Sequence, residues 1–108
     1  MATVNKVLGQ LNPAATTLST LYTVPSSTSV VCSTLVVCNQ GVNTTFRIAV
    51  RPAGASIDPK HYIVYDGVLN ASDSTFLTLG ITLAATDVVS VYAGTANVSF
   101  SLFGAELS

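Results

Sequence analysis

The strongest constraint on the fold is an alternation of apolar and polar residues with a period of two, repeated in short segments along the chain. Segment 44–51, TTFRIAVR, shows it most clearly. Phe46 and Ile48 occupy even-numbered positions, and Arg47 and Arg51 occupy odd-numbered positions. A strand points successive side chains to opposite faces, so we expect the phenylalanine and isoleucine in the core and the arginines outside it. Helical spacing is almost absent.

The alternating segments are separated by turn residues about 8 to 12 positions apart, which is typical of all-β sandwiches. The expected strands are 20–24, 29–39, 44–51, 61–66, 74–83, 88–94 and 97–104. We expect an all-β fold, either an antiparallel β-sandwich or a jelly-roll-like barrel of six to eight short strands. Gly80 should mark a bulge or bend, and the last two segments are close enough to form a hairpin.

The chain has 108 residues, enough for one domain. We divide it into an N-terminal arm, residues 1–14, and a single sandwich domain, residues 15–108. The arm alternates only weakly and carries Gly9 and Pro13. Three interpretations stay open: an added edge strand, an extended segment lying on another subunit, or a disordered arm.

Charged residues make up 8% of the chain, against a typical share of about 25%. Serine and threonine fill the polar positions instead. Either this is a small β domain with a hydroxyl-rich surface, or much of the surface is covered in an assembly, because interface cores are poor in charge. The net charge of −1 gives nothing to attract nucleic acid. We expect no membrane-spanning segment and no secretory signal.

Cys32 and Cys38 are six positions apart. On a regular strand they would share one face and lie about 20 Å apart, too far for a disulfide. We interpret them as two buried thiols. A bridge from either cysteine to a neighbouring chain stays open.

The sequence offers no recognisable catalytic, cofactor-binding or metal-ligating motif. The single histidine, His61, follows Lys60 and is interpreted as a surface residue at the start of a strand. The acidic residues fall mostly at turns, where aspartate commonly bonds its own backbone. The aromatic residues are spread one or two per strand, as in a sandwich core, so a glycan site is a weaker hypothesis. We expect no enzyme and no cofactor.

Arg47 and Arg51 carry half of the lysine and arginine charge of the chain. They could be exposed strand residues paired with aspartates across the sheet. They could also be anchors in an interface, since the planar guanidinium binds carboxylates and carbonyls in a bidentate way. The candidate interface residues are Lys6, Leu8, Arg47, Arg51, Lys60 and His61.

The segments FRIAVRPAG, residues 46–54, and LGITLAATDVVSVYAG, residues 79–94, carry a likeness that extends over nearly the whole chain. The chain resembles a family of small structural proteins in the virions of tailed phages. The resemblance implies a protein of the virion, assembled in the host cytoplasm, and no enzyme. A capsid decoration or cement protein is the first expectation, as a homo-oligomer, preferably a trimer, bound to the major capsid protein or another virion protein. The alternatives are a tail, baseplate or fibre-junction component, or a glycan-binding attachment module.

Overall fold

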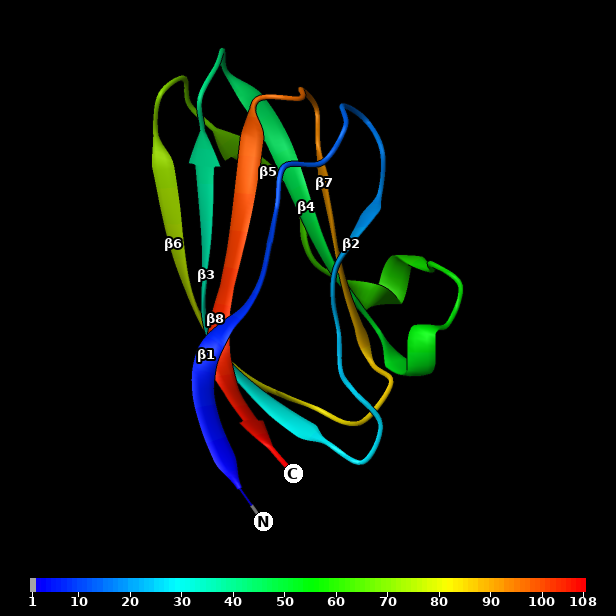
Figure 1. Cartoon of the computed structure of the whole chain (residues 1–108). Helices are drawn as coiled ribbons and strands as arrows, with labels where there is room; N and C mark the ends of the chain where they lie inside the picture. The colour runs from blue at the N-terminus through cyan, green and yellow to red at the C-terminus, as the bar shows by residue number, and fades with distance from the viewer. Residues whose placement is uncertain (1) are drawn as a thin grey trace.

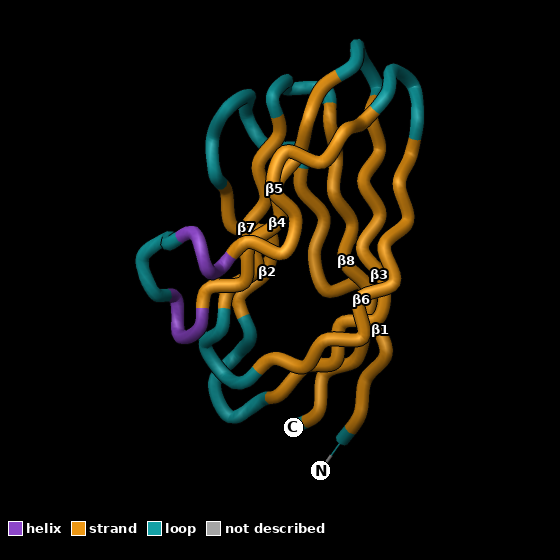
Figure 2. Tube along the Cα trace, turned by 180° about the vertical axis from the view of Figure 1, so that it is seen from behind, coloured by secondary structure: helices purple, strands orange, loops and turns teal. Residues whose placement is uncertain are grey.

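The computed structural model describes residues 2–108 and folds them into two antiparallel four-stranded sheets packed face to face (Figure 1). The strands are β1 (Thr3–Leu11), β2 (Ser19–Thr23), β3 (Ser29–Asn39), β4 (Thr44–Arg51), β5 (Tyr62–Leu69), β6 (Ser74–Leu83), β7 (Val88–Ala93) and β8 (Val98–Leu107). Two short 3₁₀ helices, η1 (Pro52–Gly54) and η2 (Pro59–His61), lie between β4 and β5. They project from one side of the sandwich, as Figure 2 shows.

The strand order is β1-β8-β3-β6 in one sheet, here called sheet A, and β2-β7-β4-β5 in the other, sheet B. Only β4 and β5 are consecutive strands that pair with each other, and every other connection crosses from one sheet to the other. This order is that of an eight-stranded jelly roll. The prediction of an all-β antiparallel sandwich with six to eight strands is therefore confirmed.

The connection between β7 and β8 differs from the predicted hairpin. β7 pairs with β2 and β4 in sheet B, whereas β8 pairs with β1 and β3 in sheet A. The short link at residues 94–97 therefore steps between the two sheets. A turn of this length permits either arrangement, and the choice depends on which sheet offers the free neighbours, so local sequence could not decide it.

The core lies between the sheets. It consists of the residues that the alternation of apolar and polar positions predicted to face inward. Phe46 is 3% exposed and Ile48 is fully buried. On β8 the inward residues Val98, Phe100 and Leu102 are also fully buried. The rings of Phe46 and Phe100 meet across the sandwich with centroids 6.4 Å apart. Each of the two sheets thus supplies one large aromatic to a shared core.

A row of irregularities crosses sheet A at one level. The register shifts after Val7 on β1, around Ser33 on β3, and between Thr78 and Ile81 on β6. Gly80 lies in the last of these with φ of +61°, a conformation that suits glycine. The bulge predicted at Gly80 is confirmed, and the whole sheet is irregular at this level.

This irregularity corrects the interpretation of the two cysteines. Cys32 is completely buried and on the core side, but the extra residue at Ser33 reverses the parity, so Cys38 lies on the outer face and is partly exposed. Both thiols are free. Burial raises the pKa of the Cys32 thiol to about 11, which makes it unreactive at neutral pH.

Residues 3–11 form β1, an edge strand of sheet A that is antiparallel to β8. This is one of the three interpretations left open for residues 1–14. Ala2 and Ser108 exchange two backbone hydrogen bonds of 2.8 and 2.9 Å, so the two ends of the chain lie side by side. Leu8, a candidate interface residue, is only 8% exposed and belongs to the core. Its burial leaves it little surface to offer a partner.

Candidate functional site

Arg47 lies on the outer face of sheet B, as the alternation predicted, and is held there by three neighbours. Its Nε donates to Asp66 Oδ1 at 2.7 Å, and its Nη2 reaches Asp66 Oδ2 at 3.4 Å. The guanidinium carbon also lies 4.2 Å from the ring centre of Tyr65 and 4.4 Å from that of Tyr92. The hydrogen bond to Asp66 raises the pKa of Arg47 further above its usual value. The arginine thus fixes two tyrosine rings in place.

Arg51 is also engaged within the chain. Its Nε donates to Ser90 Oγ at 3.1 Å, and its Nη1 donates to the carbonyl oxygens of Gly54 at 3.4 Å and Ala55 at 3.0 Å. Ser90 is 1% exposed on the outer side of β7. Arg51 therefore ties the loop with η1 and η2 to sheet B, which explains why a second arginine stands four positions after the first.

We expect Arg51→Ala to lower the free energy of unfolding by about 2 kcal/mol, because the buried Ser90 hydroxyl and two loop carbonyls lose their donor. Chemical denaturation measures the change, with Ser90→Ala and the double variant completing a cycle that isolates the pair. A change under about 0.5 kcal/mol would mean that Arg51 is an ordinary surface residue.

His61 closes the η2 turn and does not face solvent. It is 7% exposed, and its Nδ1 accepts a hydrogen bond of 3.1 Å from the backbone N–H of Asp58. The Asp58 carboxylate in turn accepts from the N–H of Lys60 at 3.2 Å. The interpretation of His61 as a surface residue is therefore wrong, because a reciprocal capping arrangement draws the ring inward. Lys60 is exposed beside it.

An open depression of about 500 Å³ lies next to this turn and is lined by Ile57, Asp58, Pro59, Tyr62 and Tyr65. The Tyr62 and Tyr65 rings contact edge to face with centroids 5.0 Å apart. Strict alternation along segment 61–66 would place these two tyrosines on opposite faces, but the extra residue Ile63 in the pairing of β5 with β4 brings both to the outer face of sheet B. Sequence reasoning therefore missed this tyrosine cluster. The sequence around Ile63 contains no glycine that would mark the extra residue.

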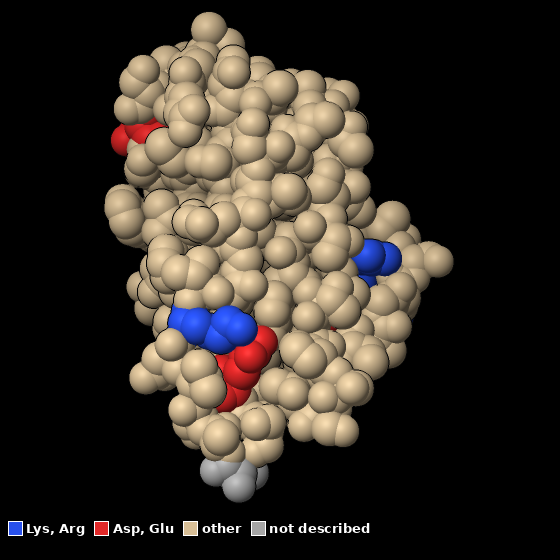
Figure 3. All heavy atoms as spheres, in the orientation of Figure 1, with Lys and Arg blue, Asp and Glu red and all other residues tan. Residues whose placement is uncertain are grey.

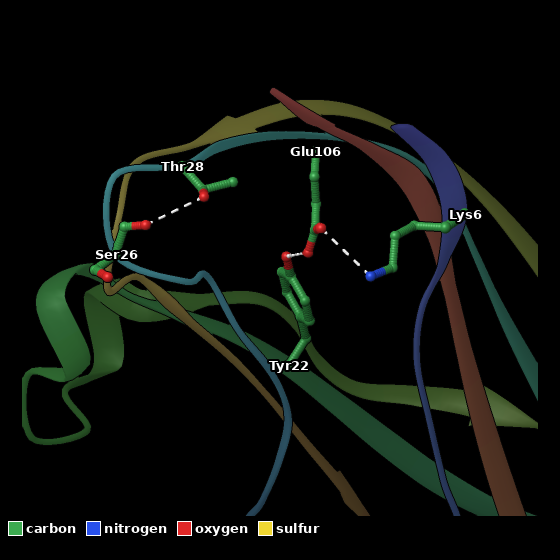
Figure 4. A network of polar contacts seen from close by, with 5 residues as sticks. All are labelled: Lys6, Tyr22, Ser26, Thr28 and Glu106. Atoms are coloured by element: carbon green, nitrogen blue, oxygen red, sulfur yellow. Dashed lines mark hydrogen bonds and ion pairs between the residues drawn. The ribbon is translucent and has the colours of Figure 1, made fainter. Parts of the chain in front are cut away.

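Lys6 belongs to a network of side chains that lies between β1, β8 and β2 (Figure 4). The Glu106 carboxylate on β8 accepts from Lys6 Nζ at 3.3 Å and from Tyr22 Oη at 2.5 Å. These hydrogen bonds, chiefly the one from Tyr22, lower the pKa of Glu106, while burial and the adjacent carboxylate raise the pKa of Tyr22. The network joins β1, β8 and β2, so it links both sheets.

The Glu106 network should stabilise the fold in a pH-dependent way. A folded-state pKa below the usual 4.5 means that the contribution is complete above that value and is lost as the pH falls through the folded-state pKa. We expect Glu106→Gln to lower Tm near pH 7, and the difference in Tm from the parent chain to shrink as the pH falls below 4.5 and the carboxylate takes up a proton. Thermal melts at several pH values measure this, and a gap independent of pH would contradict it.

The outer face of sheet A has a distinctive composition. The register between its strands places only uncharged residues there. They are Thr3, Asn5, Val7, Gln10, Ser29, Val31, Thr34, Val36, Cys38, Ser74, Phe76, Thr78, Thr82, Ser99, Ser101, Phe103, Ala105 and Leu107. Its exposed apolar side chains include Phe76, 72% exposed, and Val7, 46% exposed. In the orientation of Figure 3, charged residues form a few separate spots on an otherwise uncharged surface.

The described residues contain no group of three or more histidine, cysteine, aspartate or glutamate side chains that could hold a metal ion. Within the same residues 2–108, no helix has the length and apolar character needed to cross a membrane. The aspartates at turns accept backbone hydrogen bonds, as Asp87 does from Ala53 and Ala84.

Comparison of the chain with models of known protein families gives no match, and comparison with curated proteins gives none either.

Proposed function

We propose that this chain is a non-enzymatic structural protein of a virus particle, and that it works by contact through the outer face of sheet A. One observation carries the proposal: four strands present a continuous uncharged face with exposed valine and phenylalanine side chains. The centres of protein interfaces are depleted in charge and enriched in aromatic residues. A face of this composition gains free energy when another protein covers it.

The location in a tailed-phage particle rests on the resemblance carried by residues 46–54 and 79–94. The jelly roll is compatible with it, since shell proteins of viruses use this fold, although the fold alone assigns no function. In this role the chain is a capsid decoration protein, which associates with its own copies and with the major capsid protein. Each copy would bridge neighbouring shell subunits and so strengthen the head against internal pressure.

Separating heads from tails and quantifying the chain in each fraction tests this role. A decoration protein should be found in the head fraction in a fixed ratio to the major capsid protein. A few copies in the tail fraction would favour a tail, baseplate or fibre-junction component instead. Absence of the chain from both fractions would overturn the structural role.

A glycan-binding attachment module is the second candidate, and the depression between Tyr62, Tyr65 and Asp58 favours it. Aromatic walls with a few polar groups are typical of small-ligand sites, and Arg47 holds Tyr65 rigidly. A glycan array probed with the parent chain and with Tyr65→Ala tests this function. Binding that the substitution abolishes would support it, and an array without signal would remove it.

A further inference from the structure

The sandwich has four edge strands, and three of them carry features that hinder pairing with another strand. β1 presents Lys6 and a bulge at Leu8. β2 is five residues long and its register shifts between Thr20 and Tyr22. β5 has two register shifts and a charged residue, Asp66, with φ of 53°. Bulges, charges and short length are the usual means of keeping strand edges apart.

β6 has little such protection. Its ten residues, STFLTLGITL, contain no charged residue and no proline. Its single irregularity lies at Leu79 and Gly80, so the segment 74–78 before it pairs regularly with β3. An uncharged, regular edge rich in β-forming residues is a template for a further strand.

Alternate residues of the segment 74–78 direct their backbone N–H and C=O groups away from β3, toward the unpaired edge of the sheet. The N–H of Asn39 on β3 donates to the carbonyl of Asp73 at 2.8 Å. Because hydrogen-bonding pairs alternate in an antiparallel ladder, residues 75 and 77 also point their backbone groups toward β3. Residues 74, 76 and 78 then point theirs outward. The N–H of Ser74 is taken by the side chain of Asp73, which leaves both groups of Phe76 and Thr78 free.

We propose that β6 pairs antiparallel with β6 of a second copy of this chain, about a twofold axis at Phe76, so that two A sheets join into one. The strand fits itself in this register. Phe76 opposes Phe76, and Ser74 opposes Thr78, all on the uncharged outer face. About four backbone hydrogen bonds form between the copies, two at Phe76 and one from each Thr78 N–H to a Ser74 carbonyl.

A second copy of this chain is the favoured partner because β6 carries no charge that would repel the same residue on another β6. Like charges directly opposite each other would disfavour self-pairing, and the segment has none. Two phenylalanines, each 72% exposed, become covered at the axis. Aromatic pairs across strands stabilise a sheet by about 0.2 to 1 kcal/mol beyond alanine. A twofold contact of this kind closes as a dimer, so it favours an even number of copies over the trimer that the sequence analysis expected.

Replacing Phe76 by charged residues tests the contact. The parent chain should sediment as a reversible dimer of twice 11.1 kDa as its concentration rises. Phe76→Lys and Phe76→Glu should each weaken the dimer at least about tenfold, because like charges then oppose across the axis. An equimolar mixture of the two variants should restore the dimer, since opposite charges now meet.

Val68→Lys is the matched control, because Val68 is 76% exposed on edge strand β5 of the other sheet. It should leave the dimer unchanged. All three variants should keep the parent Tm within a few degrees, since both positions are exposed. A parent chain that remains monomeric to about 1 mM, a trimer, or a dimer that Phe76→Lys leaves intact would overturn the proposal.

A backbone variant tests the hydrogen bonds themselves. Thr78→Pro removes an N–H that points away from β3, so the monomer loses no ladder bond. It should weaken the dimer while Tm changes little, whereas unchanged association would contradict strand pairing. These tests use the purified chain and are separate from the location in a particle: a dimer absent from virions refutes only the proposed function, and a monomeric virion protein refutes only the pairing.

Discussion

Phe100→Ala is expected to lower the free energy of unfolding by about 3 to 5 kcal/mol. The ring is fully buried at the centre of β8 and meets Phe46 of the opposite sheet. Its removal deletes the largest of the fully buried side chains in the described residues and leaves a cavity that rigid strands cannot close. For a domain of this size, the expected fall in Tm is about 12 °C or more. Urea denaturation and calorimetry measure both quantities.

Phe103→Ala is the matched control, because it removes the same side chain from the other face of the same strand. Phe103 is partly exposed and lies on the outer face of sheet A. Its loss should cost about 1 kcal/mol or less. Equal costs for the two substitutions would contradict the assignment of inner and outer faces on β8.

Gly104→Ala is expected to cost about 3 kcal/mol, although it adds a single methyl group. A Cβ at this position would overlap the carbonyl oxygen of Val31 and lie 3.1 Å from the Cα of Cys32. Both are backbone atoms of the paired strand β3, so neither can turn aside. The sheet must open at the row of bulges that crosses it. Chemical denaturation gives the cost.

Gly80→Ala provides the comparison for this prediction. No atom lies within 4 Å of a Cβ at Gly80, and only its φ of +61° disfavours alanine. We therefore expect a cost of about 1 kcal/mol. If Gly104→Ala proved as mild as Gly80→Ala, the close approach of β8 and β3 at this level would be wrong.

Period-two alternation predicted the bounds of several strands, and it predicted which residues face inward where a strand is regular. The expected bounds 29–39 and 74–83 coincide with β3 and β6, and the inward positions of β4 and β8 are the buried ones. These residues obey a local rule, since a strand that buries one face must alternate.

The same rule failed wherever a strand gains an extra residue. The bulge at Ser33 separates Cys32 from Cys38, and the irregular pairing of β5 brings Tyr62 and Tyr65 together. A bulge reverses parity without a strong sequence signal, except where glycine marks it, as at Gly80.

Contacts between segments that are distant in the sequence could not be predicted either. Arg47 was correctly placed outside the core. One interpretation paired it with an aspartate on a neighbouring strand, and in the structure that aspartate is Asp66. Its position between Tyr65 and Tyr92 depends on β5 and β7 flanking β4, which no local pattern reveals. Among the candidate interface residues, Leu8 and His61 are buried, and Lys6, Arg47 and Arg51 have partners within the chain. None of these candidate residues belongs to the outer face of sheet A, which we now propose as the contact surface.

The few charged residues of the chain are distributed unevenly over the structure. Lys6 and Glu106 are the charged residues in the strands of sheet A, and their pairing places both on its inner side. The outer face therefore holds none, while sheet B and the turns carry the rest. This distribution favours a covered outer face over a uniformly hydroxyl-rich surface, and it links the composition to the proposed structural role.

Electron cryomicroscopy of the intact phage particle tests that role most directly. We predict density for this jelly roll on the particle, with the outer face of sheet A turned toward a neighbouring subunit. Particles without this chain, or a chain whose uncharged face points into solvent, would contradict the account.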